Sequence, residues 1–205
     1  RLSQRGSFGD IAASSFGGMV YYTSPDRSSL LELLQSDSIK EICDADWKDL
    51  TIERLPEIPN FTLLVGWTGQ VAITDSLIQA TEQKRKVETD SAFYKEFLSK
   101  SQAIVQGLQS AWNQQDIPAL QEGIRANRAL LNEFAQEMQL EIETPALQTL
   151  CDIAEQVGAC AKTSGAGGGD CGICFTQNET QRQQIETQWA KAQIQVLPLT
   201  IAEAW

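Results

Sequence analysis

One stretch of the sequence places five glycines in eleven positions. It runs from Lys162 to Gly172 and reads KTSGAGGGDCG. Glycine in an ordered element costs about 0.5–1 kcal/mol relative to alanine, so such a cluster indicates a need for positive φ or for close approach of a ligand. A tight connection between two strands would need only two glycines. Because Ser, Thr and Lys flank the cluster, we favour an anion site made of backbone N–H groups.

Two common nucleotide-binding patterns do not explain this stretch. Gly167, Gly169 and Gly172 match G-x-G-x-x-G by spacing. That pattern must open a helix, whereas the sequence that follows here, CGICFT at 171–176, has the composition of a strand. A Walker A loop is excluded because no G-K-[ST] follows the glycines.

The cysteine and histidine content narrows the chemistry. The chain of 205 residues has five cysteines and no histidine. The commonest general base, the nucleophile pairs that use histidine and the ordinary zinc site are therefore excluded, and proton transfer falls to Asp, Glu, Lys or Tyr. An odd number of cysteines argues against a disulfide framework. Cys171 and Cys174 would point to opposite faces of a strand, so we predict reduced thiols there, with no metal.

The charge balance excludes two classes of partner. With 16 basic and 27 acidic residues, the net charge is −11, which repels nucleic acids and anionic membrane surfaces. No apolar run reaches the roughly 18 residues of a membrane helix, and the first ten residues lack the apolar core of a signal peptide. We therefore expect a cytoplasmic protein that binds neither nucleic acid nor membranes.

Hydrophobic periodicity predicts an α+β fold, with helices packed on one side of a largely antiparallel sheet. A short helix near Asp10 precedes a strand, and the runs at 50–56 and 61–67 are expected to pair as a hairpin. The later chain predicts an αα-hairpin (91–112 and from 116), a helix from Pro145 capped by Thr144, strands at 159–164 and 171–176, a helix over 179–192 and a strand at 194–201.

Several stretches resemble the GHMP kinases, the family of galactokinase, homoserine kinase, mevalonate kinase and phosphomevalonate kinase. The sequence KTSGAGGGDCGI is similar to the third conserved motif of this family, and its DCGI ending resembles the bacterial phosphomevalonate kinases. Other stretches that agree in order are GSFGDIAASSFGG (6–18), LLVGWTGQVAITDSLI (63–78), IRANRALLNEF (124–134) and IETPALQTLCDIA (142–154). The combination of VGWTG with SGAGGGDCG is the most specific feature.

The resemblance implies the ATP-dependent phosphorylation of 5-phosphomevalonate to the 5-diphosphate, with Mg²⁺, in a cleft between two domains. It implies that residues 1–48 are the end of the GHMP N-terminal domain and that residues 49–205 form the GHMP kinase C-terminal domain. The family's P-x-x-x-G-L-G-S-S-A phosphate motif is not in this sequence. We therefore expect the C-terminal portion of such a kinase, with its N-terminal domain missing.

This expectation has two consequences for the isolated chain. Half of a divided active site does not position a phosphoryl group, so the chain alone is predicted to be inactive. The surface that the missing domain would cover is expected to be apolar, which favours self-association as a homodimer.

The same resemblance assigns roles to single residues. Asp10 matches the acidic position of GSxGD, where a carboxylate would hold magnesium, orient the acceptor or take a proton; a plain helix cap is the alternative. Ser7 matches a substrate-phosphate contact, with a turn serine as its alternative. The loop that closes on the substrate and the transferred phosphate corresponds to Ser164, Gly165, Ala166 and Gly167.

Further candidates lie outside these two motifs. Thr74 falls where the family has Ser or Thr near the substrate, although a helix cap is the favoured interpretation. Arg125 and Arg128 lie one turn apart and could grip a phosphate, with Arg128 the candidate ligand; a solvated side chain is the commoner role of a helical arginine. Lys162 would add positive charge beside the loop.

Two alternatives to this function stay open. The chain could derive from another GHMP enzyme, such as mevalonate kinase or diphosphomevalonate decarboxylase. It could also be a non-catalytic binding fragment, because half of the phosphate cradle is absent from the sequence.

Overall fold

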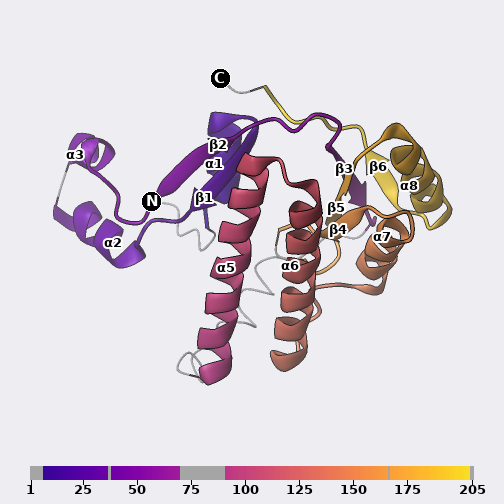
Figure 1. Cartoon of the computed structure of the whole chain (residues 1–205). Coiled ribbons are helices and arrows are strands. Elements are labelled where there is room, and N and C mark those ends of the chain that lie inside the picture. The colour runs from indigo at the N-terminus through magenta and orange to yellow at the C-terminus, as the bar shows by residue number, and fades with distance from the viewer. Residues whose placement is uncertain (1–6, 37, 70–90, 166, 204–205) are drawn as a thin grey trace. The chain divides into compact units, whose positions relative to one another are not determined.

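The computed structural model describes residues 7–36, 38–69, 91–165 and 167–203 of the chain (Figure 1). The chain divides into two compact units. The first consists of Arg1–Glu57 together with Ile201–Trp205, and the second of Ile58–Thr200. The assignment of the first unit to the end of a GHMP N-terminal domain stays a prediction.

The first unit contains a two-stranded antiparallel sheet. Strand β1 (Met19–Thr23) pairs with β2 (Thr51–Leu55) along their whole length. Helix α1 (Gly9–Phe16) precedes β1 and ends at a glycine of positive φ, as its Gly-Gly stop predicts. Helices α2 (Arg27–Ser36) and α3 (Ile39–Asp44) lie between the two strands in sequence. The final residues of the chain join this unit through a hydrogen bond from Gly18 to Ala202.

The second unit contains a four-stranded sheet in the order β4-β5-β3-β6, in which every pairing is antiparallel. Its strands are β3 (Thr62–Trp67), β4 (Cys160–Thr163), β5 (Cys171–Thr176) and β6 (Gln195–Leu197). The glycine-rich stretch therefore joins an edge strand, β4, to an inner strand, β5.

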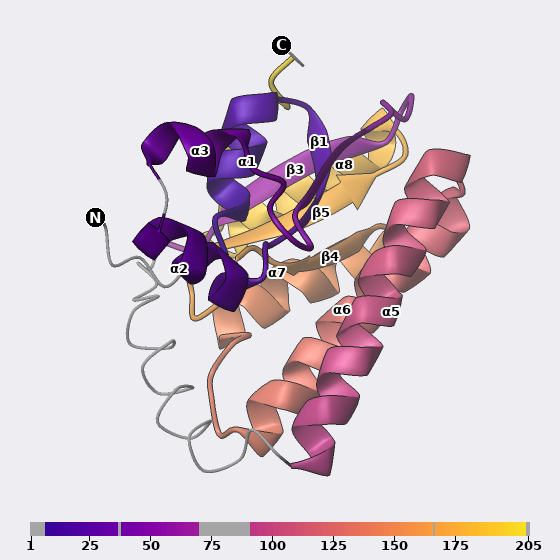
Figure 2. The ribbon, with the colours of Figure 1, turned by 90° about the vertical axis from the view of Figure 1, so that its left-hand side faces the viewer.

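Helices cover one face and one edge of this sheet (Figure 2). They are α5 (Ala92–Gln114), α6 (Ile117–Glu137), α7 (Pro145–Gln156) and α8 (Glu179–Lys191). α7 and α8 bury Leu150, Ile185 and Trp189 against the sheet residues Leu64 and Cys174. α6 packs along β4, and α5 packs on α6 as the predicted αα-hairpin. The α+β class with an antiparallel sheet is thus confirmed.

The start of α7 confirms the cap predicted at Thr144, and α5 and α6 begin with side-chain caps that were not predicted. Ser91, Asp116 and Thr144 each accept a hydrogen bond from the backbone N–H three residues later, at the starts of α5, α6 and α7. Strand β5 also confirms the rejection of a Rossmann loop, because no helix follows the glycines. Cys171 and Cys174 are free thiols, the first half-buried and the second fully buried.

The predicted hairpin of residues 50–56 and 61–67 is wrong. Both runs are strands, but β2 pairs with β1, whereas β3 pairs with β5 and β6. Leu64 and Gly66 of β3 are buried under α7 and α8, and this burial needs strands of the second unit on both sides. The apolar character of β3 therefore indicates its strand partners better than its closeness to β2 in the sequence does.

Two helices were not predicted. α2 has adjacent leucines with exposed members, such as Leu31 and Leu34, so its periodicity is indistinct. α3 is short, yet its capping box was readable in the sequence: Ser38 and Glu41 each accept from the other's backbone N–H. The last strand is shorter than predicted because Pro198 follows it directly.

Candidate functional site

The glycine loop between β4 and β5 is fixed at its base and at its far end. The Ser164 N–H donates to the Cys171 carbonyl at 2.9 Å, and the Gly168 N–H donates to the Ile142 carbonyl at 2.8 Å. Gly165, Gly167, Gly168 and Gly169 all have positive φ. The loop is therefore both a strand connection and a bare run of backbone, so the two interpretations of the glycines are compatible.

Gly167 is the position where the chain itself demands glycine. A Cβ atom built there would lie 2.4 Å from the Ile142 carbonyl oxygen, and φ is 75°. At Gly165, by contrast, a Cβ would meet nothing within 4 Å, although φ is 61°. Close packing against Ile142 therefore requires glycine at position 167. At position 165 the space around the residue is open, and only the positive φ favours glycine.

Thr68 is a residue at this loop that sequence reasoning missed. Its hydroxyl donates to the Gly169 carbonyl, and its backbone N–H donates to the Asp170 carbonyl at 3.0 Å. Thr68 follows β3 directly, so it ties the end of the central strand to the loop. The signal was present, since Thr68 is the threonine of VGWTG.

Some backbone donors of the loop have no partner among the described residues. They include the N–H groups of Gly165 and Gly169, for which no protein acceptor is present in that part of the chain. Donors of this kind bind an anion without needing to break an existing hydrogen bond. Anion binding by this loop stays a prediction, and these donors support it.

Lys162 lies on β4, two residues before Ser164. Its ammonium group donates to the Thr163 carbonyl at 2.8 Å. Desolvation by burial lowers the pKa of Lys162 below its ordinary value. The Lys162 side chain is thus bound to the backbone at the start of the loop, and its contribution of positive charge to an anion site stays a prediction.

The two arginines of α6 form ion pairs within the second unit. Arg128 contacts Glu143 at 2.5 Å and Asp152 at 3.0 Å, and Arg125 contacts Glu155 at 2.7 Å. The hydrogen bonds that Arg128 donates to the Glu143 carboxylate are the main reason that the pKa of Arg128 is raised. Phosphate binding by Arg128 stays a prediction, and it would require the guanidinium to exchange or share a carboxylate partner.

The GSFGD stretch lies in the first unit, at the start of α1. Phe8 has a left-handed conformation with φ 64°, and the Ser7 hydroxyl accepts a weak hydrogen bond from the Gly9 N–H at 3.4 Å. Asp10 is exposed in the first turn of the helix and is not its N-cap residue. Its carboxylate has no hydrogen-bond or ion-pair partner within the described ranges, so it is free to contact a ligand.

Tyr22 on β1 is a second residue that sequence reasoning missed. Its hydroxyl donates to the Ser7 carbonyl at 2.5 Å, and its ring lies 3.4 Å from where a Cβ of Gly9 would be. Burial raises the pKa of Tyr22, and the Asp10 carboxylate also acts to raise it. Tyr22 therefore anchors the turn that carries Ser7 and Asp10.

The predicted site residues thus form two separate groups. Ser7 and Asp10 lie in the first unit, whereas Ser164, Gly165, Gly167 and Arg128 lie in the second. Thr74 and Ala166 lie outside the described residues.

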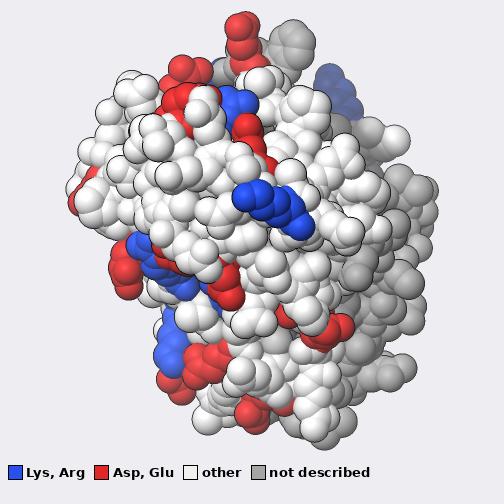
Figure 3. Space-filling model, turned by 90° about the vertical axis from the view of Figure 1, so that its right-hand side faces the viewer, with Lys and Arg blue, Asp and Glu red and all other residues white. Residues whose placement is uncertain are grey.

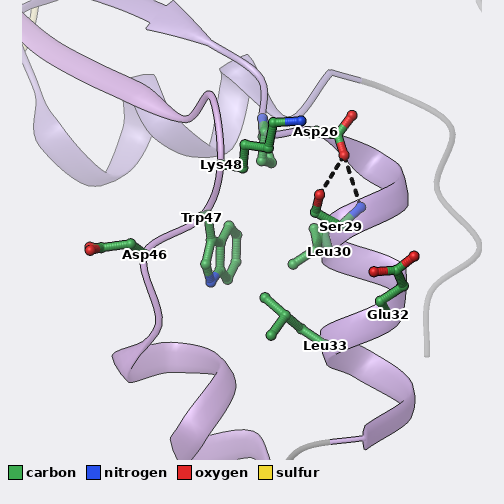
Figure 4. Close-up of a pocket in the computed structure, with 9 residues that line it drawn as sticks. Asp26, Ser29, Leu30, Glu32, Leu33, Asp46, Trp47 and Lys48 are labelled. Carbon is green, nitrogen blue, oxygen red and sulfur yellow. Dashed lines mark hydrogen bonds between the residues drawn. The ribbon is translucent and has the colours of Figure 1, made fainter.

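The first unit also has a pocket that contains none of the predicted site residues (Figure 4). Its volume is about 340 Å³. Trp47 faces Leu30 and Leu33 across it, while Asp46 and Glu32 lie at its rim. The Asp26 carboxylate is already occupied, because Ser29 donates to it through both its backbone N–H and its hydroxyl.

Three other kinds of site would indicate other functions: a basic surface patch, a metal cluster and a membrane-spanning helix. On the face in Figure 3, most Lys and Arg side chains lie next to Asp or Glu, so no broad basic patch forms there. The described residues hold no group of three or more Cys, Asp or Glu suited to a metal ion. None of the described helices is both long and apolar enough to cross a membrane.

Comparisons with known proteins agree with this fold. The sequence model of the family described as GHMP kinases C terminal matches residues 105–195. A curated phosphomevalonate kinase from Streptomyces sp. (strain CL190) is 38% identical over 203 residues, which are 98% of this chain and 54% of that kinase.

Solved structures give the same result. A Lin0012 protein from Listeria innocua has a TM-score of 0.91 at 33% identity, covering 98% of this chain and 56% of that one. The phosphomevalonate kinase of Streptococcus pneumoniae, in complex with phosphomevalonate and AMPPNP, has a TM-score of 0.81 at 28% identity, covering 95% and 55%. The chain spans about half the length of the relatives it matches.

Proposed function

Because this chain belongs to the GHMP kinase family, we propose that it is the C-terminal part of an ATP-dependent phosphomevalonate kinase. The reaction would convert 5-phosphomevalonate to 5-diphosphomevalonate, a step of isoprenoid synthesis. The observation that carries this proposal is the similarity to a phosphomevalonate kinase along 98% of the chain. The glycine loop and the GSFGD turn supply the residues for it.

The chemistry asks little of a general base. The acceptor oxygen belongs to a phosphate and is already anionic, so catalysis depends on positioning and on stabilising charge in the transition state. In the proposed role, the N–H groups of Gly165 and Gly169, which have no acceptor in the part of the chain that the structure describes, bind phosphate oxygens. The hydroxyls of Ser164 and Ser7 would add neutral donors, and so would Thr74 if it lies near the substrate. Lys162 would add positive charge at the base of the loop.

Asp10 is the residue proposed to act beside the reacting phosphate. Mg²⁺ in such enzymes takes one or two carboxylates and completes its shell with phosphates and water. A single exposed carboxylate at a helix start fits this limited demand, so Asp10 would be the magnesium ligand. When bound, the ion would neutralise the charge of the transferred phosphoryl group.

Several wider predictions belong to the same proposal. Residues 1–48 would be the end of the N-terminal domain, with its remainder as the missing partner of the active site. A cytoplasmic location and a homodimer are proposed with it. Exposed leucines of α2, such as Leu31 and Leu34, provide apolar surface in the first unit.

The test is a comparison of acceptors with the complete gene product that contains these residues. ATP and Mg²⁺ are supplied with 5-phosphomevalonate, mevalonate or 5-diphosphomevalonate in turn, and ADP release and the phosphorylated product are measured. Turnover confined to 5-phosphomevalonate is expected. Turnover of mevalonate alone, or decarboxylation of 5-diphosphomevalonate, would assign the chain to another enzyme of the family.

The isolated chain of 205 residues provides the second arm of this test. It is expected to show no ADP release above a buffer blank, because half of the phosphate site is absent. The intact mass of the gene product in its native cell should be measured first. A mass equal to the 22.6 kDa of this chain would favour a non-catalytic binding protein.

A further inference from the structure

Three consecutive residues between α6 and α7 connect the glycine loop to both helices. The Ile142 carbonyl accepts the hydrogen bond from the Gly168 N–H. The next residue, Glu143, binds side chains of α6, and Thr144 caps α7. The position of the Ile142 carbonyl therefore depends on the contacts that fix residues 142–144 to α6 and α7.

Glu143 holds the connection through a nearly buried set of contacts. Arg128 donates to its carboxylate through Nε at 2.9 Å and through a terminal nitrogen at 2.5 Å. Asn132 donates to it at 3.1 Å. The side chains of Arg128 and Glu143 are only 17% and 7% exposed. A two-point contact of this kind fixes direction as well as distance, and it is screened little by solvent.

We propose that Arg128 is a positioning residue for the glycine loop: its ion pair with Glu143 fixes the Ile142 carbonyl, and that carbonyl fixes Gly167 and Gly168. The close contact at Gly167 makes this coupling stiff, because the loop backbone rests directly on Ile142. The effect on loop position follows from the second unit alone. The consequence for phosphate binding rests on the proposed function.

This role differs from direct phosphate binding by Arg128 in a measurable way. If Arg128 acts through Glu143, removing either partner should disturb the loop alike, and removing both should add little further. If Arg128 instead binds phosphate, its loss should weaken anion binding, whereas the loss of Glu143 should leave the guanidinium freer to bind.

The experiment uses the chain of 205 residues labelled with ¹⁵N-glycine, which gives at most 14 backbone signals. The variants are Arg128→Gln, Glu143→Gln and the double substitution. Arg125→Gln is the matched control, because Arg125 also joins α6 to α7 through a carboxylate, Glu155. Gly107 on α5 is the internal reference, since its surroundings are open. Hydrogen exchange and chemical shift of each glycine amide are recorded, and a thermal melt verifies folding.

The expected result is faster exchange of the Gly168 amide, on the order of tenfold, in Arg128→Gln and Glu143→Gln alike. The double variant should match the single ones, and Arg125→Gln and the Gly107 signal should not change. An unchanged Gly168 amide in a folded Glu143→Gln variant would overturn the proposal, and so would an equal effect of Arg125→Gln. Should Arg128→Gln fail to fold, Arg128→Lys keeps the charge and loses the two-point contact, so the same comparison applies.

A titration with inorganic pyrophosphate separates this inference from the proposed function. Shifts of Gly165 and Gly169 that weaken in the Arg128 and Glu143 variants would support both. If pyrophosphate moves no glycine signal while the Gly168 effect persists, the loop does not bind phosphate by itself and the positioning role stands. If anion binding weakens in Arg128→Gln alone, Arg128 is a phosphate ligand and the positioning role is wrong.

Discussion

Gly66 and Gly172 lie directly opposite each other on β3 and β5, and the side chain of Leu150 fills the space that both residues leave empty. A Cβ atom at Gly66 would lie 2.8 Å from Leu150, and one at Gly172 would lie 2.6 Å from it. This pair explains why VGWTG and DCGI each contain glycine in mid-strand, where glycine ordinarily weakens a sheet. Helix α7 approaches the sheet closely at this point.

Gly172→Ala is expected to destabilise the chain by about 1–3 kcal/mol, because the added methyl group overpacks the core against Leu150. Urea unfolding measures the change. Gly107→Ala is the control: it lies in α5 with nothing within 4 Å of its Cβ, so it should stabilise the chain by roughly 0.5–1 kcal/mol. A neutral Gly172→Ala would mean that α7 does not pack as closely as described.

The glycine loop permits a second matched comparison. Gly167→Ala combines a left-handed φ with a collision against the Ile142 carbonyl, whereas Gly165→Ala meets only the unfavourable φ. We expect Gly165→Ala to cost roughly 1–2 kcal/mol and Gly167→Ala clearly more. Differential scanning calorimetry on both variants decides the order. Equal losses would show that the contact with Ile142 imposes no additional cost.

The buried thiols should resist alkylation in the native state. Burial raises the pKa of Cys151 and of Cys160 to about 12, and it also raises that of Cys174. At pH 8 only about one such thiol in ten thousand is ionised. Mass spectrometry after brief iodoacetamide treatment should find Cys43, the exposed cysteine, modified first, and all five after denaturation. Rapid native labelling of Cys151 would contradict the described core.

Lys162 makes stability depend on pH at the alkaline side. Its folded pKa is lowered by burial from the ordinary 10.5, so between the two pKa values the unfolded chain binds more protons than the folded one. Stability should therefore rise with pH through that window. Lys162→Met should be more stable than the parent at pH 7, and the difference should shrink as the pH approaches 10.5. A difference that is constant from pH 7 to 10 would show that Lys162 is well solvated.

The sequence predicted well those features that depend on local chemistry. The helix cap at Thr144 and the strand character of 171–176 follow from side chains and periodicity within a few residues. The partner of β3 did not follow, because strand pairing depends on burial against α7 and α8, which are distant in sequence. Within the site, the loop glycines were identified by composition. The roles of Thr68 and Tyr22 depend on their contacts with backbone carbonyls, and a sequence does not display such contacts.

Asp10→Asn tests the proposed role of the GSFGD turn in the complete gene product that contains these residues. If Asp10 faces the transferred phosphoryl group, losing its charge should lower kcat on the order of a hundredfold or more. Thermal stability should change little, since the carboxylate is exposed and has no partner among the residues that the structure describes. Asp26→Asn in the same unit is the control, because asparagine caps α2 as well as aspartate does.

The alternative role of Asp10 gives the opposite pattern. A carboxylate that only supports the start of α1 contributes about 0.3–1 kcal/mol to stability through the helix dipole. Asp10→Asn would then lower the melting temperature slightly and leave kcat unchanged. Asp10→Glu distinguishes further: it keeps the charge near the dipole but moves the oxygens away from the proposed position. If Asp10→Glu keeps the melting temperature of the parent but has a lower kcat, then catalysis requires the position of the carboxylate and not its charge alone.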